Sequence, residues 1–338
     1  MSAKAQVKSS RPAWRVRIRA AVMVTMLLST ILLSHAAAFD SEEAPAEGFH
    51  FQLDEHGGVL RLFEGDAPVL TYCFSEQLKQ GVPADRTRCC YLHPLFGLNG
   101  EALTDDFPKD HYHHRGVSLM WPNVRVGDRW LDLWHLNGLR PHFNRWLTRR
   151  AGRDRAVIAA VHDWKVGERT VAHETMRVEA HRADADSRAI DIAYRLQAIG
   201  APLTLRGEYR EGKGYGGFNV RFAPRASTKL ITDRGETAED SLHTRYRWAG
   251  LFGQFRSDET WSGLVVFPYP NNPDLPTSWI LRNYGFVGVC WPGVDPLNVH
   301  PDQPVSLKYR IIVYRTMPKA QAIERTYQKF IAGLTSEK

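Results

Sequence analysis

Cysteine is scarce in this 338-residue chain, and long apolar runs are scarcer still. The four cysteines, Cys73, Cys89, Cys90 and Cys290, are too few for a disulfide framework, and none belongs to a CxxC pair of the kind that binds zinc. We expect them to be buried small residues. Beyond residue 38 no apolar run approaches the roughly 20 residues that cross a bilayer, which excludes a protein with several spanning helices.

The apolar run that does occur lies at the N-terminus and has the pattern of a signal peptide. Six basic residues precede an apolar stretch over residues 20–34, and three alanines follow at 36–38. We predict a signal peptide over residues 1–38 and a polar lead-in over 39–48. The protein is then exported, periplasmic or secreted, and touches a membrane only if the signal stays uncleaved.

An excess of charge of one sign is also missing from the predicted mature chain. The chain has 44 Lys and Arg against 37 Asp and Glu, and six of the basic residues lie in the signal, which leaves 38 against 37. Proteins that bind nucleic acid usually present a concentrated basic face to the phosphates. We therefore do not expect a nucleic-acid partner.

What the chain has in quantity is the alternation of a β-strand. Residues 189–196 place Ile190, Ile192, Tyr194 and Leu196 on one face. Similar runs cover residues 59–63, 69–74, 117–121, 157–161, 173–178, 203–209, 218–222, 263–267 and 307–311. Turns with glycine separate several of these runs. The pattern predicts an all-β protein, with one large antiparallel β-sandwich over residues 49–334.

One helix is predicted, close to the C-terminus. Pro318 suits the first turn of a helix, and Gly333 is expected to end it. An apolar stripe between them faces the sheets, and it consists of Ile323, Tyr327, Phe330 and Ile331.

The densest group of reactive side chains lies in residues 106–116, which read DFPKDHYHHRG. Pro108 disfavours a helix and a strand follows at 117, so these residues form a loop that enters a strand. An extended chain would turn His111 and His113 one way and His114 the other, so a bend is needed for all three to meet. Asp106 or Asp110 can fix an imidazole tautomer.

Two chemistries fit this histidine loop, and the spacing leaves both open. In the first, His111, His113 and His114 exchange protons with a ligand, and Arg115 holds a carboxylate or hydroxyl group. In the second, His111 and His113 bind a divalent metal together with Asp110. Three more histidines can complete such a site from elsewhere, namely His93, His135 and His243. The lack of a second ligand cluster favours the first reading, without a cofactor.

Aromatic and basic residues further along the chain are candidates for ligand binding. Trp134 and His135 can form a sugar-stacking wall with a polar tip, or pack in the core. Arg282 and Tyr284 follow a loop rich in Pro and Asn and can clamp a polar ligand, or lie on the sheet surface. Arg221 alternates with apolar neighbours and faces either a cleft or solvent.

Several motifs in a fixed order resemble the PmoA-like family of exported bacterial proteins, often labelled methane oxygenase. They are YLHPLFG at 91–97, the histidine loop, DLWH at 132–135, GGFNVRF at 216–222, PNNP at 270–273 and RNYG at 282–285. The resemblance spans nearly the whole predicted mature chain. It implies a galactose mutarotase-like supersandwich that acts on or binds sugars, and its label implies a metal-dependent oxygenase.

The chain departs from this family directly before the Gly-Gly-Phe motif. Relatives often carry a lysine and a glutamate there, whereas Tyr215 stands at the expected position of the carboxylate. If that glutamate is the catalytic base in the relatives, the resemblance implies that this chain uses Glu211 or Glu208 instead, or works differently. We predict a carbohydrate-active protein that uses histidine acid–base chemistry with Glu211, as an epimerase, lyase or glycoside hydrolase. A non-catalytic carbohydrate-binding protein and a metal-dependent oxidoreductase remain alternatives, and the partner is a carbohydrate or another small polar ligand.

Overall fold

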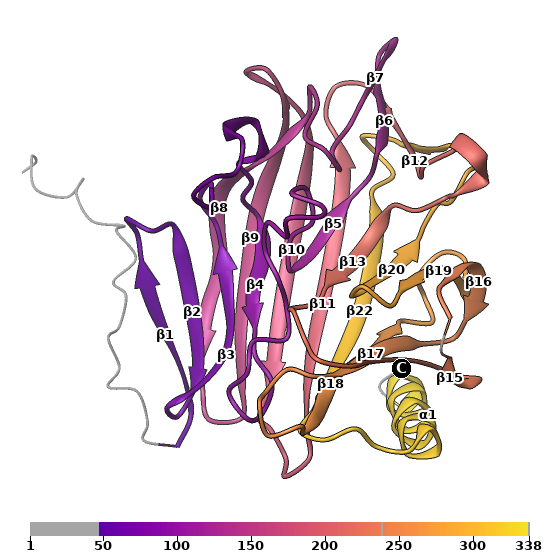
Figure 1. Ribbon diagram of the computed structural model, residues 1–338. Helices are drawn as coiled ribbons and strands as arrows, with labels where there is room; N and C mark the ends of the chain where they lie inside the picture. The colour runs from indigo at the N-terminus through magenta and orange to yellow at the C-terminus, as the bar shows by residue number, and fades with distance from the viewer. Residues whose placement is uncertain (1–46, 238, 337–338) are drawn as a thin grey trace, which may run out of the picture. The chain divides into compact units, whose positions relative to one another are not determined.

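The computed structural model describes residues 47–237 and 239–336, which belong to one compact unit. The predicted signal peptide and nearly all of the lead-in lie outside the described residues. Within them, antiparallel strands form two nine-stranded sheets and one four-stranded sheet (Figure 1).

The first sheet carries the histidine loop at the start of its central strand β5. Its strands in spatial order are β1 (Phe49–Asp54), β2 (Val59–Glu64), β3 (Ala67–Cys73), β4 (Tyr91–Leu95), β5 (Val117–Met120), β13 (Gly217–Arg221), β20 (Phe286–Cys290), β19 (Thr277–Arg282) and β16 (Ser241–Tyr246). Strand β13 pairs with β5 on one side and with β20 on the other. This order brings the loop before β5 close to the β19–β20 hairpin, although about 170 residues separate them in the sequence.

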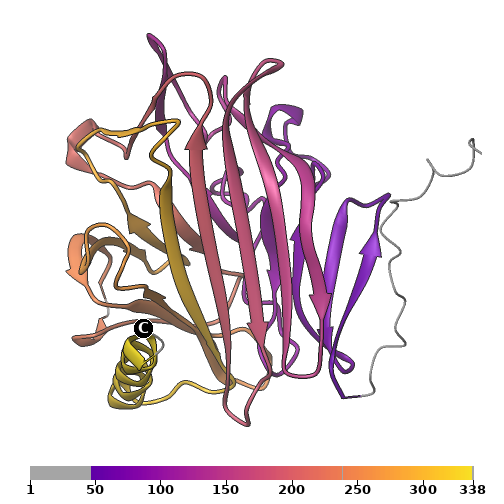
Figure 2. The same ribbon diagram turned by 180° about the vertical axis from the view of Figure 1, so that it is seen from behind.

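The second sheet contains the longest strands, which form the near face of Figure 2. Its strands in order are β15 (Gly235–Thr237), β14 (Thr228–Thr232), β17 (Ala249–Gln254), β18 (Trp261–Pro268), β22 (Val305–Tyr314), β11 (Ser187–Ala198), β10 (Arg169–His181), β9 (Arg155–Val166) and β8 (Arg140–Ala151). The small sheet orders β21 (Leu297–Val299), β12 (Leu203–Arg206), β6 (Asn123–Val126) and β7 (Arg129–Leu131).

The main core lies between the two large sheets. Leu62 of β2, Tyr72 of β3, Met176 of β10 and Ile192 of β11 are each at most 1% exposed and belong to one continuous apolar cluster. Because alternate residues of a strand point to opposite faces, each large sheet contributes one apolar face to this layer.

A second apolar layer covers the outer face of the second sheet at one end. Helix α1 (Ala320–Ser336), which lies near β17 in Figure 1, packs Ile323, Tyr327 and Phe330 against residues of β17, β18 and β22. Strand β18 is therefore covered on both sides. Its Leu264 and Val266 belong to the main core, whereas Val265 and Phe267 face the helix.

The structure confirms the predicted all-β fold, with large antiparallel sheets packed as a sandwich and one C-terminal α-helix. Each run of alternating residues overlaps a strand. The predicted end of the helix at Gly333 is wrong, because α1 continues to Ser336. A glycine inside a helix costs only about 1 kcal/mol, which packing of the preceding turns can offset. No helix among the described residues is both long and apolar enough to cross a membrane.

Candidate functional site

Residues 106–116 form a loop of successive tight turns that gathers the three histidine rings. The amide of His111 donates to the carbonyl of Pro108 (3.0 Å), and the amide of His114 donates to that of His111 (2.9 Å). As a result His111 and His114 stack with their ring centres 4.6 Å apart, and His113 lies 4.5 Å from His114. The bend required for the three rings to meet is present.

Arg115 holds this loop from behind. Its side chain is fully buried and donates to the carbonyls of Tyr112, His114 and Arg86. Its Nε lies 3.3 Å from Oδ1 of Asp106, while burial raises the pKa of Asp106 to about 6 despite this cation. Arg115 therefore anchors the loop and is not among the residues that line the cavity, and the binding role predicted for it stays a prediction.

The histidines face a cavity of about 390 Å³ built by four segments of the chain. These segments are the histidine loop, the turn after β7, the residues before β13 and the β19–β20 hairpin. The lining consists of His111, His113, His114, Trp134, His135, Lys213, Tyr215, Ile280, Arg282, Tyr284 and Phe286. No carboxylate belongs to this set, so cations, imidazoles and phenols supply its polar groups.

Two of the cavity histidines have Nδ1 within 2.9 Å of an aspartate, and the contact at His135 is a hydrogen bond. Nδ1 of His135 lies 2.8 Å from Oδ2 of Asp132, whose Oδ1 accepts the amides of Trp134 and His135 at 2.8 Å. Nδ1 of His111 lies 2.9 Å from Asp110, which also accepts two hydrogen bonds from Arg221. A carboxylate at Nδ1 favours the tautomer with its proton there, which leaves the lone pair on Nε2.

Aromatic rings stack on either side of the paired histidines. Tyr284 stacks on His111 with 5.2 Å between ring centres, and Phe286 lies 4.7 Å from His114. Trp134 belongs both to the main core and to the cavity lining, and it is only 4% exposed. The two interpretations of Trp134, as a core residue and as part of a ligand site, are therefore compatible.

Burial keeps the inner two imidazoles neutral. It lowers the pKa of His113 to about 2 and that of His114 well below its usual value, and the neighbouring histidines add to both shifts. Nδ1 of His114 is buried and has no hydrogen-bond partner within the described part of the chain. Such an orphaned polar atom beside a cavity is a ready contact for a ligand.

Other predicted residues lie beside the cavity or away from it. Arg221 is buried below Tyr284, 4.9 Å from its ring, and positions Asp110. Glu211 is exposed outside the lining and pairs with Lys213 at 2.8 Å. Glu208, the other carboxylate considered, accepts the amide of Arg210 and is also outside the lining.

The predicted metal ligands do not gather into a set. Across residues 47–237 and 239–336, no three or more side chains of His, Cys, Asp and Glu are arranged to hold a metal ion. His93 contacts Thr104 at 3.1 Å, and His243 contacts the carbonyl of Gly212. Of the three histidines considered as distant additions, only His135 joins the cavity.

Four polar or aromatic residues of the site were not predicted from the sequence: Asp132, Lys213, Tyr215 and Phe286. Asp132 could have been recognised from its spacing. An aspartate three residues before a histidine can accept hydrogen bonds from the backbone amides of the turn and also contact the imidazole ring. Tyr215 was noted only as a missing carboxylate. Tyr215 lines the cavity, and burial together with Glu208 raises its pKa to about 12.

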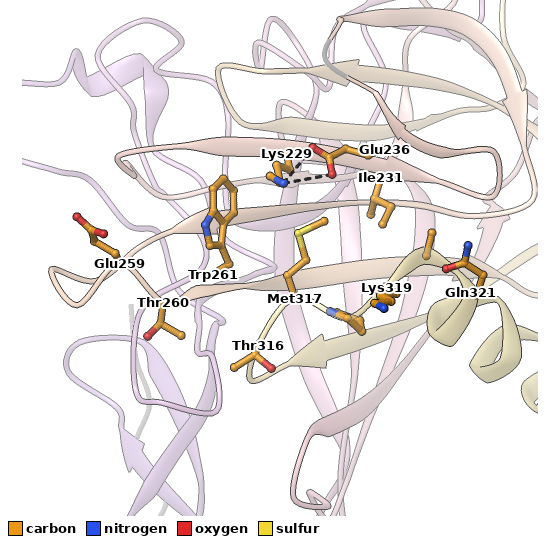
Figure 3. Close-up of a pocket in the computed structure, with 12 residues that line it drawn as sticks. Lys229, Ile231, Glu236, Glu259, Thr260, Trp261, Thr316, Met317, Lys319 and Gln321 are labelled. Atoms are coloured by element: carbon orange, nitrogen blue, oxygen red, sulfur yellow. Dashed lines mark hydrogen bonds and ion pairs between the residues drawn. The ribbon is translucent and has the colours of Figure 1, made fainter.

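A larger hollow of about 690 Å³ lies between β14, β15, β18 and the segment that enters α1 (Figure 3). Lys229 and Glu236 form an ion pair of 3.2 Å across it, and Lys229 lies 5.1 Å from the ring of Trp261. Lys229 and Glu236 thus satisfy each other, and none of the predicted site residues lines this hollow.

Comparison with known proteins gives a family without an assigned function. The profile of a family of unknown function, DUF6807, matches residues 60–328. No curated protein matches the chain.

Solved structures that resemble the chain do so weakly. They include an α-galactosidase from Geobacillus stearothermophilus in complex with raffinose (11% identity, TM-score 0.36), of which the chain spans 41% while 80% of the chain is covered. A GalM/aldose epimerase homologue from C. elegans has 8% identity and a TM-score of 0.32, and the match covers 81% of this chain and 100% of that one. A galactose mutarotase related enzyme from Lactobacillus acidophilus has 7% identity and a TM-score of 0.35, and the match covers 80% of this chain and 99% of that one. At such identities and TM-scores these likenesses assign no activity.

Proposed function

Because the chain belongs to DUF6807, a family of unknown function, we propose its function from its own site: the cavity binds a carbohydrate, and its histidines transfer protons on it. The observation that carries the proposal is the convergence of four histidines, two of them with Nδ1 beside an aspartate, with aromatic rings around one cavity of about 390 Å³. That volume lies in the range of small-ligand sites.

The polar lining suits a ligand with many hydroxyl groups. Neutral imidazoles and phenols each donate and accept hydrogen bonds, and Lys213 and Arg282 add cationic donors. The apolar faces of Phe286 and Trp134 suit the C–H surface of a sugar ring. Because the lining has cations and no carboxylate, a sugar with an acidic substituent fits it better than a cationic one.

His135 is the proposed proton carrier, and His113 is its neutral neighbour. Asp132 holds Nδ1 of His135, so Nε2 is free to take a proton, and the ring of His113 lies 4.3 Å away. His113 is neutral because burial lowers its pKa to about 2, so it is a weak base that exchanges hydrogen bonds with a bound hydroxyl and leaves the proton to His135. Epimerisation, elimination and glycoside hydrolysis all require such transfers. Glu211 stays a prediction, with Lys213 as its link to the cavity.

The test compares binding and turnover in one panel of neutral and acidic monosaccharides and their glycosides. We expect a panel member to bind in calorimetry and to be converted, as followed by NMR. His135→Gln should slow conversion at least about 100-fold and change affinity only a few-fold, because general acid–base catalysis contributes that much. His50→Gln on β1 is the matched control and should behave as the wild type.

The other outcomes decide between the alternatives. Binding without conversion in the wild type identifies a carbohydrate-binding protein, and no binding at all contradicts the proposal. The PmoA-like resemblance keeps its metal-dependent oxidoreductase as a further candidate. Stoichiometric iron or copper in the purified protein, lost in the double variant His111→Ala, His113→Ala, favours that candidate. We also propose that the protein is exported. This rests on the predicted signal peptide over residues 1–38, which lies outside the described residues.

A further inference from the structure

Two cysteines that are neighbours in the chain bring their sulfur atoms together. Sγ of Cys89 and Sγ of Cys90 are 3.2 Å apart, although successive side chains of an extended chain point to opposite sides. The approach depends on Cys90, whose φ of 66° lies in the left-handed region that residues other than glycine seldom adopt.

Backbone contacts fix both residues in this arrangement. The amide of Cys90 donates to the carbonyl of Cys73 on β3 (2.7 Å), and the thiol of Cys89 contacts the carbonyl of Pro141 on β8 (3.2 Å). A disulfide bond measures about 2.04 Å, so the two sulfurs need to approach by only about 1 Å more. The fold thus holds the pair close to bonding geometry.

The two thiols differ in acidity in the way that disulfide exchange requires. A hydrogen bond from Cys90 lowers the pKa of Cys89, whereas burial and the adjacent sulfur raise the pKa of Cys90. Cys89 is therefore the more acidic thiol of the pair and the one that attacks first, and Cys90 is the partner that attacks second.

We propose that Cys89 and Cys90 form a thiol–disulfide redox site that reacts with a disulfide oxidant and closes into a vicinal disulfide. The Cys89 thiolate attacks one sulfur of the oxidant, whose S–S bond breaks and whose other half leaves as a thiol after taking a proton. Cys90 then loses its proton and attacks Cys89 in the mixed disulfide, which releases the second half as a thiol. The pair loses two electrons and two protons, and the oxidant gains both.

The pair is attached to the segment that supports the cavity. Arg86, the last residue of η1 (Ala84–Arg86), donates to the carbonyl of His135 (3.0 Å), and Arg88, next to Cys89, donates to that of Leu133 (2.8 Å). Formation of the Cys89–Cys90 disulfide therefore restrains a segment that is hydrogen-bonded to the backbone of the turn after β7, which lines the cavity. This site does not depend on the function proposed for the cavity.

Mass spectrometry of one tryptic peptide tests the proposal. Cleavage after Arg88 and Lys109 releases residues 89–109, which contain both cysteines of the pair and neither of the others. The full chain is incubated with glutathione disulfide or with dithiothreitol, and a second sample is refolded in the same buffers so that the reagent reaches both sulfurs. All samples are alkylated with iodoacetamide under denaturing conditions.

In the oxidised samples we expect this peptide to be unalkylated and lighter by two hydrogen atoms, and in the reduced samples to be alkylated twice. The buried thiols Cys73 and Cys290 lie on separate peptides and should be alkylated in every sample. Cys89→Ser should abolish the mass loss, whereas Cys73→Ser should leave it. Two alkylated thiols in both oxidised samples, a glutathione adduct without ring closure, or a bond to Cys73 or Cys290 would overturn the proposal.

Discussion

The orientation of His135 depends on one carboxylate that does not itself line the cavity. Asp132 holds Nδ1 of the ring through Oδ2 and the local turn through Oδ1. The same relation recurs on the second sheet, where Nδ1 of His173 lies 2.8 Å from Asp163. Because the second pair lies outside the cavity lining, it provides a comparison for the first.

Asp132→Asn should change the tautomer of His135 while the local turn keeps its conformation. The amide still accepts the turn hydrogen bonds, but it no longer favours a proton at Nδ1, so the ring shifts toward the tautomer with its proton on Nε2. Long-range ¹H–¹⁵N NMR of the imidazoles measures this directly. Asp163→Asn should alter His173 and leave His135 unchanged. An unchanged His135 spectrum in Asp132→Asn would show that the carboxylate does not set the tautomer.

His113 makes the stability of the protein fall in acid. Burial lowers its pKa in the folded state from 6.5 to about 2, so below pH 6.5 the unfolded chain binds a proton that the folded protein does not. The free energy of unfolding then decreases by up to about 1.4 kcal/mol per pH unit for this one group. Above pH 6.5 His113 is neutral in both states and does not lower the free energy of unfolding. Below pH 6.5 that free energy decreases progressively as the pH falls.

In urea titrations at pH 7.5 and pH 5, His113→Gln should therefore lose less stability on acidification than the wild type, by about 2 kcal/mol. Gln cannot be protonated, so its burial carries no pH dependence. The control is His56→Gln, an exposed residue in the turn between β1 and β2, which should follow the wild type. Equal acid sensitivity of the His113 variant and the wild type would contradict the low pKa.

Among the elements, β13 requires glycine at its first residue. Gly217 has a φ of 122°, and a Cβ there would lie 2.8 Å from the carbonyl oxygen of Val289. That oxygen belongs to β20, the neighbouring strand, so the contact cannot be relieved by a side-chain rotation. The glycine thus lets β13 lie between the strands that carry the two sides of the cavity.

Gly217→Ala should destabilise the protein by about 3 kcal/mol, because both the backbone conformation and the close approach oppose a Cβ. Gly65→Ala is the matched comparison: its φ is also positive, at 53°, but no atom lies within 4 Å of the added carbon. It should cost only about 1 kcal/mol. Thermal or urea unfolding of both variants measures the difference, and equal losses would argue against the steric contact with Val289.

The element level also shows which parts of the site can be predicted from sequence. Alternation identifies strands because it depends on neighbouring residues, and the histidine loop follows from Pro108 and the apolar run after it. The role of Arg115 could not be predicted in this way. It adjoins the histidines in sequence, yet its side chain turns behind the loop because carbonyls and Asp106 lie there.

At the scale of the whole molecule, the cavity depends on the order of strands in the first sheet. β13 separates β5 from β20, and only that order brings Tyr284 against His111. Arg282 and Tyr284 could be singled out from the sequence, but not their distance from the histidines. Glu211 was expected at the site from its place in a motif, whereas the structure exposes it outside the lining.

The second apolar layer should stabilise the molecule without shaping the cavity. Phe330 of α1 is 6% exposed and packs against Phe267 of β18 and Tyr269, with ring centres 5.8 and 4.8 Å apart. Removal of such a ring from a packed layer usually costs about 3–4 kcal/mol. None of these three residues lines the cavity.

Phe330→Ala should therefore lower the midpoint of urea unfolding while the imidazole NMR signals of His113 and His135 stay where they are in the folded protein. Lys329→Ala, at an exposed position of the same helix, should change neither. Shifted imidazole signals in Phe330→Ala would mean that the helix supports the cavity through the second sheet, because β18 contributes to both apolar layers. Unchanged signals with reduced stability would show that the cavity is held by the main core and the first sheet alone.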